Sequence, residues 1–141
     1  MSLQQHMSRK CVPYTPVASK LKELTVALVS STGVYVEGQE PYSDNGDETF
    51  RVIAGDVDSK LLRFKHGHYD TAEAERDPNC VFPLDRLRDL AEQGFIQKVS
   101  NKHIGFKGFS TDLKAQYERL APAIAHEIER SHADAVVLTG G

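Results

Sequence analysis

Cysteine is scarce in this sequence. The two that are present, Cys11 and Cys80, are too far apart to form a C-x-x-C motif, so we expect a reducing, cytoplasmic environment rather than a disulfide framework. The N-terminus lacks an apolar core followed by small residues, so a secretory signal is not expected. No apolar run approaches the roughly 20 residues of a membrane-spanning helix, which predicts no membrane segment.

Positive charge is not in excess either. The formal net charge is -3, whereas nucleic-acid binding usually needs a clustered basic face, so that class of function is not expected. P-loop, G-x-G-x-x-G and G-x-S-x-G motifs are also missing. The 141 residues are 40% apolar, enough for one domain with a real core. We expect residues 1–10 to be a vector-derived, flexible N-terminus and residues 11–141 to be the domain.

Several short runs predict strands. Residues 24–29 and 134–139 are apolar and β-branched, which is typical of strands buried on both faces. Residues 49–53 alternate, and residues 95–100 form a further predicted strand. We interpret the glycine-containing residues 101–108 as a loop.

Two helices are predicted in the second half of the chain. One begins at Pro83 and ends at Gly94, and the other begins near Ser110 or Thr111. Pro122 lies inside the second pattern and predicts a kink or two abutting helices.

Alternation of helices with strands predicts an α/β fold, specifically a parallel-sheet, three-layer (Rossmann-like) domain. We expect the strand over residues 134–139 to be central. The sequence stops at Gly141, in the turn after that strand, where a covering helix should follow. The interpretation is therefore a domain that is incomplete at its C-terminus.

The stretch from Phe64 to Arg86 is the densest in groups that can carry chemistry. His66, His68 and Asp70 alternate, so an extended backbone would point all three to one side. Gly67 and the Asp-Pro-Asn group at residues 77–79 argue against a helix before Pro83. We therefore predict a long polar connection, which in compact domains is usually functional or mobile.

Two chemical interpretations of this stretch stay open. His66, His68 and Asp70 could ligate zinc or another transition metal, with Cys80 or His103 completing the shell, or they could be ordinary surface side chains. Cys80 could be a nucleophile acidified by a histidine, or a packed and inert thiol.

A turn of small hydroxyl residues follows the first predicted strand. It consists of Ser30, Ser31, Thr32 and Gly33. Ligands in open α/β sheets bind at the carboxyl ends of strands, so this turn is a candidate substrate or anion contact, although such turns also occur without a ligand.

Blocks of sequence distributed from Cys11 onward resemble one known family. They are Val12–Pro16, Thr25–Val34, Phe50–Ile53, His66–Asp70, Asn79–Leu87 and Asp134–Thr139. Together they resemble the selenoprotein B family of glycine, betaine, sarcosine and D-proline reductases. The resemblance implies reductive cleavage of a C–N bond in a small amine.

The resemblance also implies where the redox chemistry lies. In that family the strand matching residues 134–139 leads into selenocysteine or cysteine followed by x-x-Cys, and the selenolate displaces the amine from carbon. That position falls just after Gly141, so we expect no catalytic residue and no cofactor in this chain. A UGA selenocysteine codon read as a stop would give such an end, as would a shortened chain or a native short relative.

The implied partners are a subunit that carries a pyruvoyl group in some members, a thiol electron donor, and further copies of the chain in a homo-oligomer. The expected polar lining of the site comprises Ser30, Ser31, Thr32, Gly33, His66, His68, Asp70, Cys80, His103, Thr139 and Gly140. Two alternatives remain: a metal-binding, hydrolase-like domain built on His66, His68 and Asp70, and a non-catalytic assembly module that docks through an exposed sheet edge.

Overall fold

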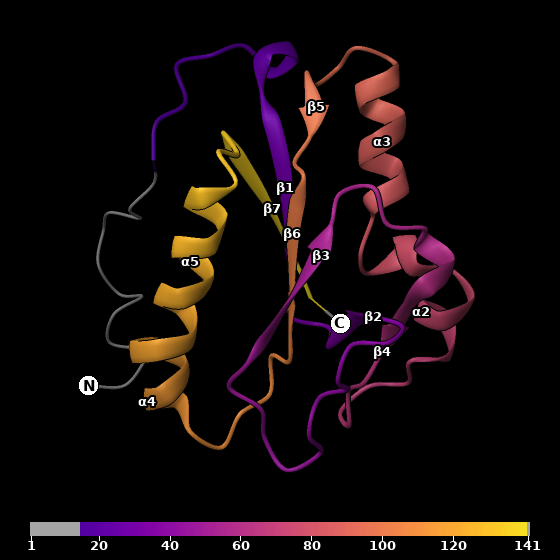
Figure 1. Cartoon of the computed structure of the whole chain (residues 1–141), viewed down its shortest axis with the longest axis vertical. Coiled ribbons are helices and arrows are strands. Elements are labelled where there is room, and N and C mark those ends of the chain that lie inside the picture. The colour runs from indigo at the N-terminus through magenta and orange to yellow at the C-terminus, as the bar shows by residue number, and fades with distance from the viewer. Residues whose placement is uncertain (1–14, 141) are drawn as a thin grey trace.

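The computed structural model describes residues 15–140 (Figure 1). Cys11 and residues 1–10, expected to be vector-derived, lie outside the described residues. The main sheet is organised on β1, which pairs in parallel with β5 and β6 along one side and with β7 along the other. β3 pairs with β6 at the far side. The strand bounds are β1 Thr25–Ser30, β3 Phe50–Ala54, β5 Lys98–Val99, β6 Lys102–Phe106 and β7 Ala135–Thr139.

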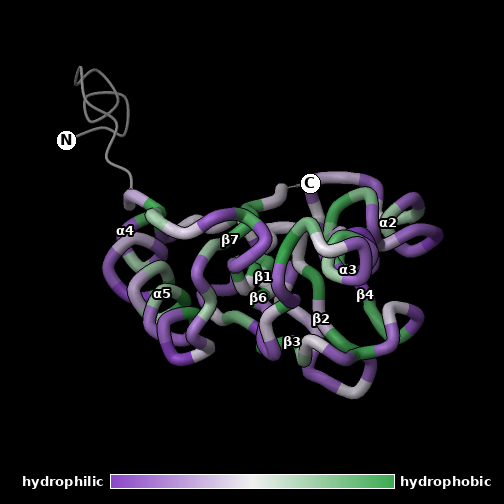
Figure 2. Tube along the Cα trace, turned by 90° about the horizontal axis from the view of Figure 1, so that it is seen from above, coloured by the Kyte–Doolittle hydropathy of each residue, from purple (hydrophilic) through white to green (hydrophobic). Residues whose placement is uncertain are grey.

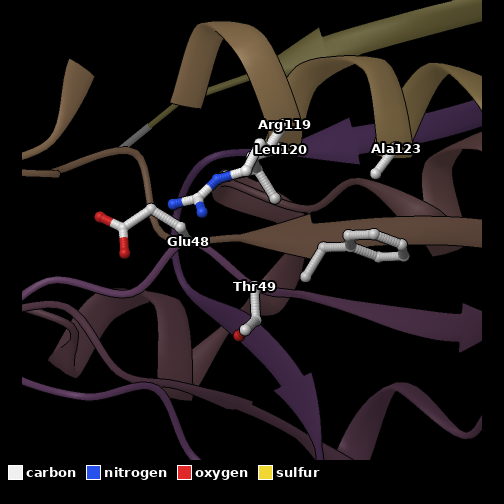
Figure 3. A pocket seen from close by; sticks show the side chains of 6 residues that line it. Glu48, Thr49, Arg119, Leu120 and Ala123 are labelled. Carbon is white, nitrogen blue, oxygen red and sulfur yellow. The ribbon is translucent and has the colours of Figure 1, made fainter. Parts of the chain in front are cut away.

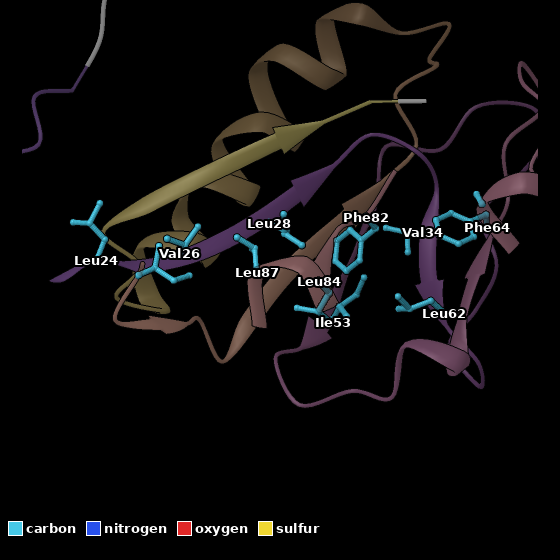
Figure 4. Packing of buried hydrophobic residues seen from close by; sticks show 12 residues of the cluster. Leu24, Val26, Leu28, Val34, Ile53, Leu62, Phe64, Phe82, Leu84 and Leu87 are labelled. Carbon is cyan, nitrogen blue, oxygen red and sulfur yellow. The ribbon is translucent and has the colours of Figure 1, made fainter. Parts of the chain in front are cut away.

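β1 separates two cores because its side chains alternate between the faces of the sheet. Val26 and Leu28 pack in one cluster with α3 (Leu84–Glu92), shown in Figure 4. Ala27 and Val29 pack in the other cluster, against α5 (Ala121–Arg130). Viewed from above, the strands lie between α5 on one side and α3 on the other (Figure 2). Helices therefore cover both faces of β1.

The expected parallel sheet is confirmed in part: β5, β6 and β7 run parallel to β1, but β3 runs antiparallel to β6. A parallel return needs a crossover connection, usually a helix, and residues 31–49, which lead from β1 to β3, contain no helix, so β3 returns antiparallel to β1 and β6. The fold is therefore α/β with a mixed sheet.

The last strand, predicted to be central, lies at the edge of the sheet that residues 15–140 form. There β7 pairs with β1 alone. Leu138 is 77% exposed. Its apolar sequence was a correct guide to a strand but not to burial, because burial depends on what packs outside it.

The helix predictions are largely confirmed. Pro83 immediately precedes α3, and Gly94, at φ +76°, follows its end. Near Pro122 the chain passes from α4 (Leu113–Ala115) through a π-helical turn, η4 (Gln116–Leu120), into α5, with the proline in the first turn of α5. This segment begins later than predicted, because the carboxylate of Asp112 accepts the backbone N–H of Ala115 (2.9 Å).

A smaller layer carries the chemistry-rich stretch. Here β2 (Val34–Val36) pairs antiparallel with β4 (Leu62–Phe64). The prediction of no helix before Pro83 is wrong, since α2 (Ala72–Arg76) and the 3₁₀ turn η3 (Pro78–Cys80) occur there. Asp70 and Asp77 accept the backbone N–H groups of Ala72 and Asn79, which stabilises these short turns. Two further 3₁₀ turns, η1 (Leu21–Glu23) and η2 (Ser59–Leu61), precede β1 and β4.

Candidate functional site

The carboxyl ends of β1 and β7 lie side by side and are tied together. The backbone N–H of Ser31 donates to the carbonyl of Thr139 (3.0 Å), directly after the last paired residues of the two strands. The hydroxyls of Ser30 and Thr32 are fully buried and 2.8 Å apart. Ser31 is the one residue of the predicted turn that reaches the surface, and Gly140, at the end of β7, is exposed.

The segment around Cys80 is anchored on this edge. The carbonyl of Val81 accepts hydrogen bonds from the hydroxyls of Thr139 (2.7 Å) and Ser30 (3.3 Å), so one oxygen holds the ends of both strands. Cys80, the residue before Val81, is exposed. The structure thus brings Cys80 next to the predicted turn although about fifty positions separate them in the sequence.

Gly33 brings the histidine stretch to the same edge. Its φ is +71°, and a Cβ at this position would lie 2.2 Å from the carbonyl oxygen of Lys65, so a side chain cannot be accommodated. The N–H of Lys65 donates to the carbonyl of Gly33 (3.0 Å). Residue 66 therefore begins its loop beside the end of β1.

Aromatic contacts hold the histidines in place. The hydroxyl of Tyr69 donates to the carbonyl of Thr32 (2.9 Å), and the ring of His66 lies 4.9 Å from that of Tyr69. His68 stacks on Phe109 with ring centroids 3.8 Å apart. Sequence reasoning missed both aromatic residues; Tyr69 was visible inside the stretch, but nothing in the sequence indicated Phe109.

Electrostatics at this edge favour neutral side chains. Burial, followed by the positive charges of Lys107 and His68, lowers the pKa of His66 below its usual value. Burial raises the pKa of Tyr69, and nearby Cys80 adds to the effect. Lys107 is itself fully buried, with its Nζ donating to the carbonyls of Ser43 (2.7 Å) and Asp44 (3.3 Å). Lys107 is a third residue, after Tyr69 and Phe109, that the sequence analysis missed.

Two predicted lining residues are placed in other roles. The carboxylate of Asp70 accepts the N–H of Ala72, as described above. His103 lies in β6, so the prediction of a loop over residues 101–108 is wrong. Its Nδ1 accepts the N–H of Leu28 (2.9 Å), while its buried Nε2 has no partner among the described residues. Burial lowers the pKa of His103 to about 4, so the ring is neutral at neutral pH.

His103 completes the sheet where β5 gives way to β6. β5 pairs with residues 25 and 26 of β1, and β6 pairs with residues 29 and 30, so the N–H of Leu28 falls in the interruption. The imidazole supplies the missing acceptor. This residue therefore has a structural role whether or not it also influences the site.

Metal binding finds little support. Across residues 15–140 no group of three or more His, Cys, Asp or Glu side chains is arranged to hold an ion.

A separate hollow of about 360 Å³ lies between the start of β3 and the helical segment η4–α5 (Figure 3). It is lined by Glu48, Thr49, Phe50, Arg119, Leu120 and Ala123, none of which belongs to the predicted site. No helix in the described part of the chain is long and apolar enough to span a bilayer.

The structure thus defines an α/β domain whose hydroxyl-, imidazole- and thiol-bearing residues meet at the carboxyl edge of two parallel strands. Comparison with known proteins gives the family. The sequence model of the glycine/sarcosine/betaine reductase selenoprotein B family matches residues 4–141, and the chain belongs to this family.

Curated relatives extend the match. D-proline reductase subunit gamma of Acetoanaerobium sticklandii is 41% identical over 91% of this chain and 53% of its own length. Glycine reductase complex component B subunit gamma of Carboxydothermus hydrogenoformans is 32% identical over 91% of this chain and 30% of its own. The chain therefore spans about half, or less, of the length of these relatives. No solved structure matches it.

Proposed function

We propose that this chain forms part of the substrate-binding edge in a reductase complex that cleaves the C–N bond of a small amine. Family membership supports the reaction class, and the polar edge formed by β1, β7 and the His66–Cys80 segment supports the place. D-proline is the first substrate to test, because a D-proline reductase subunit is 41% identical to this chain. Glycine, sarcosine and betaine are tested after it. For a polypeptide as long as that relative, we propose a three-layer, Rossmann-like fold.

Reductive cleavage needs a nucleophile at carbon, a proton for the departing amine and two electrons from a thiol donor. Selenocysteine, or cysteine in its place, supplies the nucleophile in this family; we propose that it follows Gly141. The structure is compatible with that position: a Cβ built on Gly140 would lie 3.5 Å from the hydroxyl of Ser31, so side chains there reach the polar edge. The pyruvoyl-bearing subunit, the thiol donor and a cytoplasmic location are part of the same proposal.

His66 has the clearest role of the lining residues. Its Nδ1 accepts the backbone N–H of His68 (3.2 Å), so the neutral ring carries its proton on Nε2. His66 then acts as a hydrogen-bond donor toward a carboxylate or another anion at the edge. Cys80, which is exposed, and Ser31, which is half-buried, are further polar residues of the same edge that solvent reaches.

The alternatives are not favoured. In the part of the chain that the structure describes, His66 and His68 have no third ligand arranged beside them, and Asp70 is engaged with the backbone of α2. A purely non-catalytic assembly module does not explain membership of a reductase family.

A chimera tests the proposal. In it this chain replaces the matching part of the A. sticklandii subunit, and the complex is assayed with a dithiol donor for ring opening of D-proline, followed as the appearance of a primary amine. We expect activity, and we expect His66→Ala to reduce kcat/KM about tenfold or more, whereas exposed His126→Ala leaves it unchanged. A folded, assembled chimera that is inactive on all four amines contradicts the proposal.

The position of the redox residue has an independent test in the gene. Sequencing the DNA after the Gly141 codon should show UGA followed by in-frame codons that include a nearby cysteine. Any other stop codon, or the absence of a coding continuation, contradicts that part of the proposal.

A further inference from the structure

The outer edge of β7 is the least covered apolar surface of the sheet. Val136, Val137 and Leu138 are 39%, 38% and 77% exposed, although they continue a sheet whose central strand is entirely buried. β7 pairs only with β1 within residues 15–140, so backbone N–H and C=O groups on its outer side have no strand partner. An apolar edge of this kind is a template for another strand.

An apolar groove lies beside this edge, on the face that α5 covers. Its volume is about 590 Å³, and it is lined mainly by Phe106, Ile124, Ala125, Ile128, Val136 and Leu138. Val136 and Leu138 pair with Ala27 and Val29 and so share the face of the α5 core, whereas Val137 pairs with Leu28 and faces the α3 side. The groove thus extends the α5 core outward past β7.

Topology indicates what fits there. The chain passes from β6 over the α5 face to β7, crossing β1. Crossover connections in a parallel sheet keep one hand, so a further crossover in the same direction places its helix on the same face, beside α5. That position coincides with the groove, and the following strand would lie on the free edge of β7.

We infer that the groove and the β7 edge together receive a helix–strand unit from the part of the reductase subunit that this chain does not match. The chain covers 53% of the D-proline reductase subunit gamma, so enough polypeptide remains in that relative to supply such a unit. The helix contributes an apolar stripe to the groove, and the strand pairs with β7. This inference rests on the proposed function only for the identity of the partner polypeptide.

Hydrogen exchange tests the contact without any activity measurement. Amides of residues 136–138 are compared between the isolated chain and the chimera in which the chain replaces the matching part of the A. sticklandii subunit. We expect about 100-fold slower exchange in the chimera. Equal exchange rates in two folded proteins overturn the inference, as does protection of the isolated chain that increases with its concentration, which would indicate a second copy on the edge.

A pair of variants makes the test specific. Leu138→Asp should lower the Tm of the chimera clearly more than that of the isolated chain, because the groove is covered only in the former. The control is Leu90→Asp. Leu90 lies on α3, away from the groove, and is 38% exposed, so this substitution should shift both Tm values equally. Equal shifts for Leu138→Asp overturn the inference, and neither result depends on reductase activity.

Discussion

β1 and β7 are neighbouring parallel strands of similar composition but opposite burial. The sequence of β1 is Thr-Val-Ala-Leu-Val-Ser and that of β7 is Ala-Val-Val-Leu-Thr, and five residues of each pair with the other. All six residues of β1 are buried, whereas the three central residues of β7 are exposed. The difference shows that burial is set by the number of packed neighbours, because within residues 15–140 β1 has strands on both sides and β7 has a strand on one.

Truncating matched leucines should give the largest contrast. Leu28→Ala removes a fully buried side chain of β1 and should cost about 3 kcal/mol of unfolding free energy, whereas exposed Leu138→Ala should cost less than about 1 kcal/mol. Urea denaturation of the isolated chain measures both. Equal losses would mean that β7 is already covered in solution.

The stability of β1 should depend on pH through His103, which accepts a backbone N–H of that strand. The folded-state pKa of His103 is about 4, below its ordinary value of 6.5, because burial disfavours the charged ring and the positive charge of Arg88 adds to the effect. Protons therefore bind the unfolded chain first, and stability that is complete above pH 6.5 is lost as the pH falls toward 4. The loss from this residue is on the order of 3 kcal/mol at most.

Denaturation midpoints between pH 7 and 4 measure this dependence. His103→Asn, which keeps a neutral acceptor, should flatten it, and exposed His126→Asn should not. An unchanged slope in His103→Asn would assign the acid sensitivity to another group.

The ends of the two strands offer the smallest contrast. Thr139→Val and Ser30→Ala each remove one hydroxyl from the carbonyl of Val81, and each should cost about 1 kcal/mol. The Ser30 change should cost more, because it also leaves the buried hydroxyl of Thr32 without its partner at 2.8 Å. Thermal unfolding of both variants and of the double variant measures the difference. If the two losses are equal, the Ser30–Thr32 contact adds nothing.

Much of the fold was predictable because it is encoded locally. The periodic apolar runs located β1, β7, α3 and α5, and the proline and glycine positions located their boundaries. The orientation of β3 and the edge position of β7 were not predictable, since they depend on contacts between distant segments. β6 was missed because its Lys-His-Ile-Gly-Phe sequence has the polar and glycine residues of a loop, and His103 becomes buried only by accepting the N–H of Leu28.

The candidate site also combines residues that a local sequence pattern indicated with residues that only the fold brings there. The turn after β1 and the stretch beginning at His66 were visible in the sequence, and the structure places both at one edge. Lys107 and Phe109 were invisible because neither carries a local motif, and each matters through a neighbour from another segment. Their participation is a property of the fold rather than of any short sequence pattern.

The carbonyl of Val81, which holds the ends of β1 and β7, has an evolutionary consequence. Because the acceptor belongs to the backbone, any residue that fits the local packing at position 81 preserves both hydrogen bonds. Positions 30 and 139, in contrast, must retain a hydroxyl group to keep them. Among descendants of one ancestor, substitutions should therefore accumulate at position 81 while positions 30 and 139 exchange only serine and threonine.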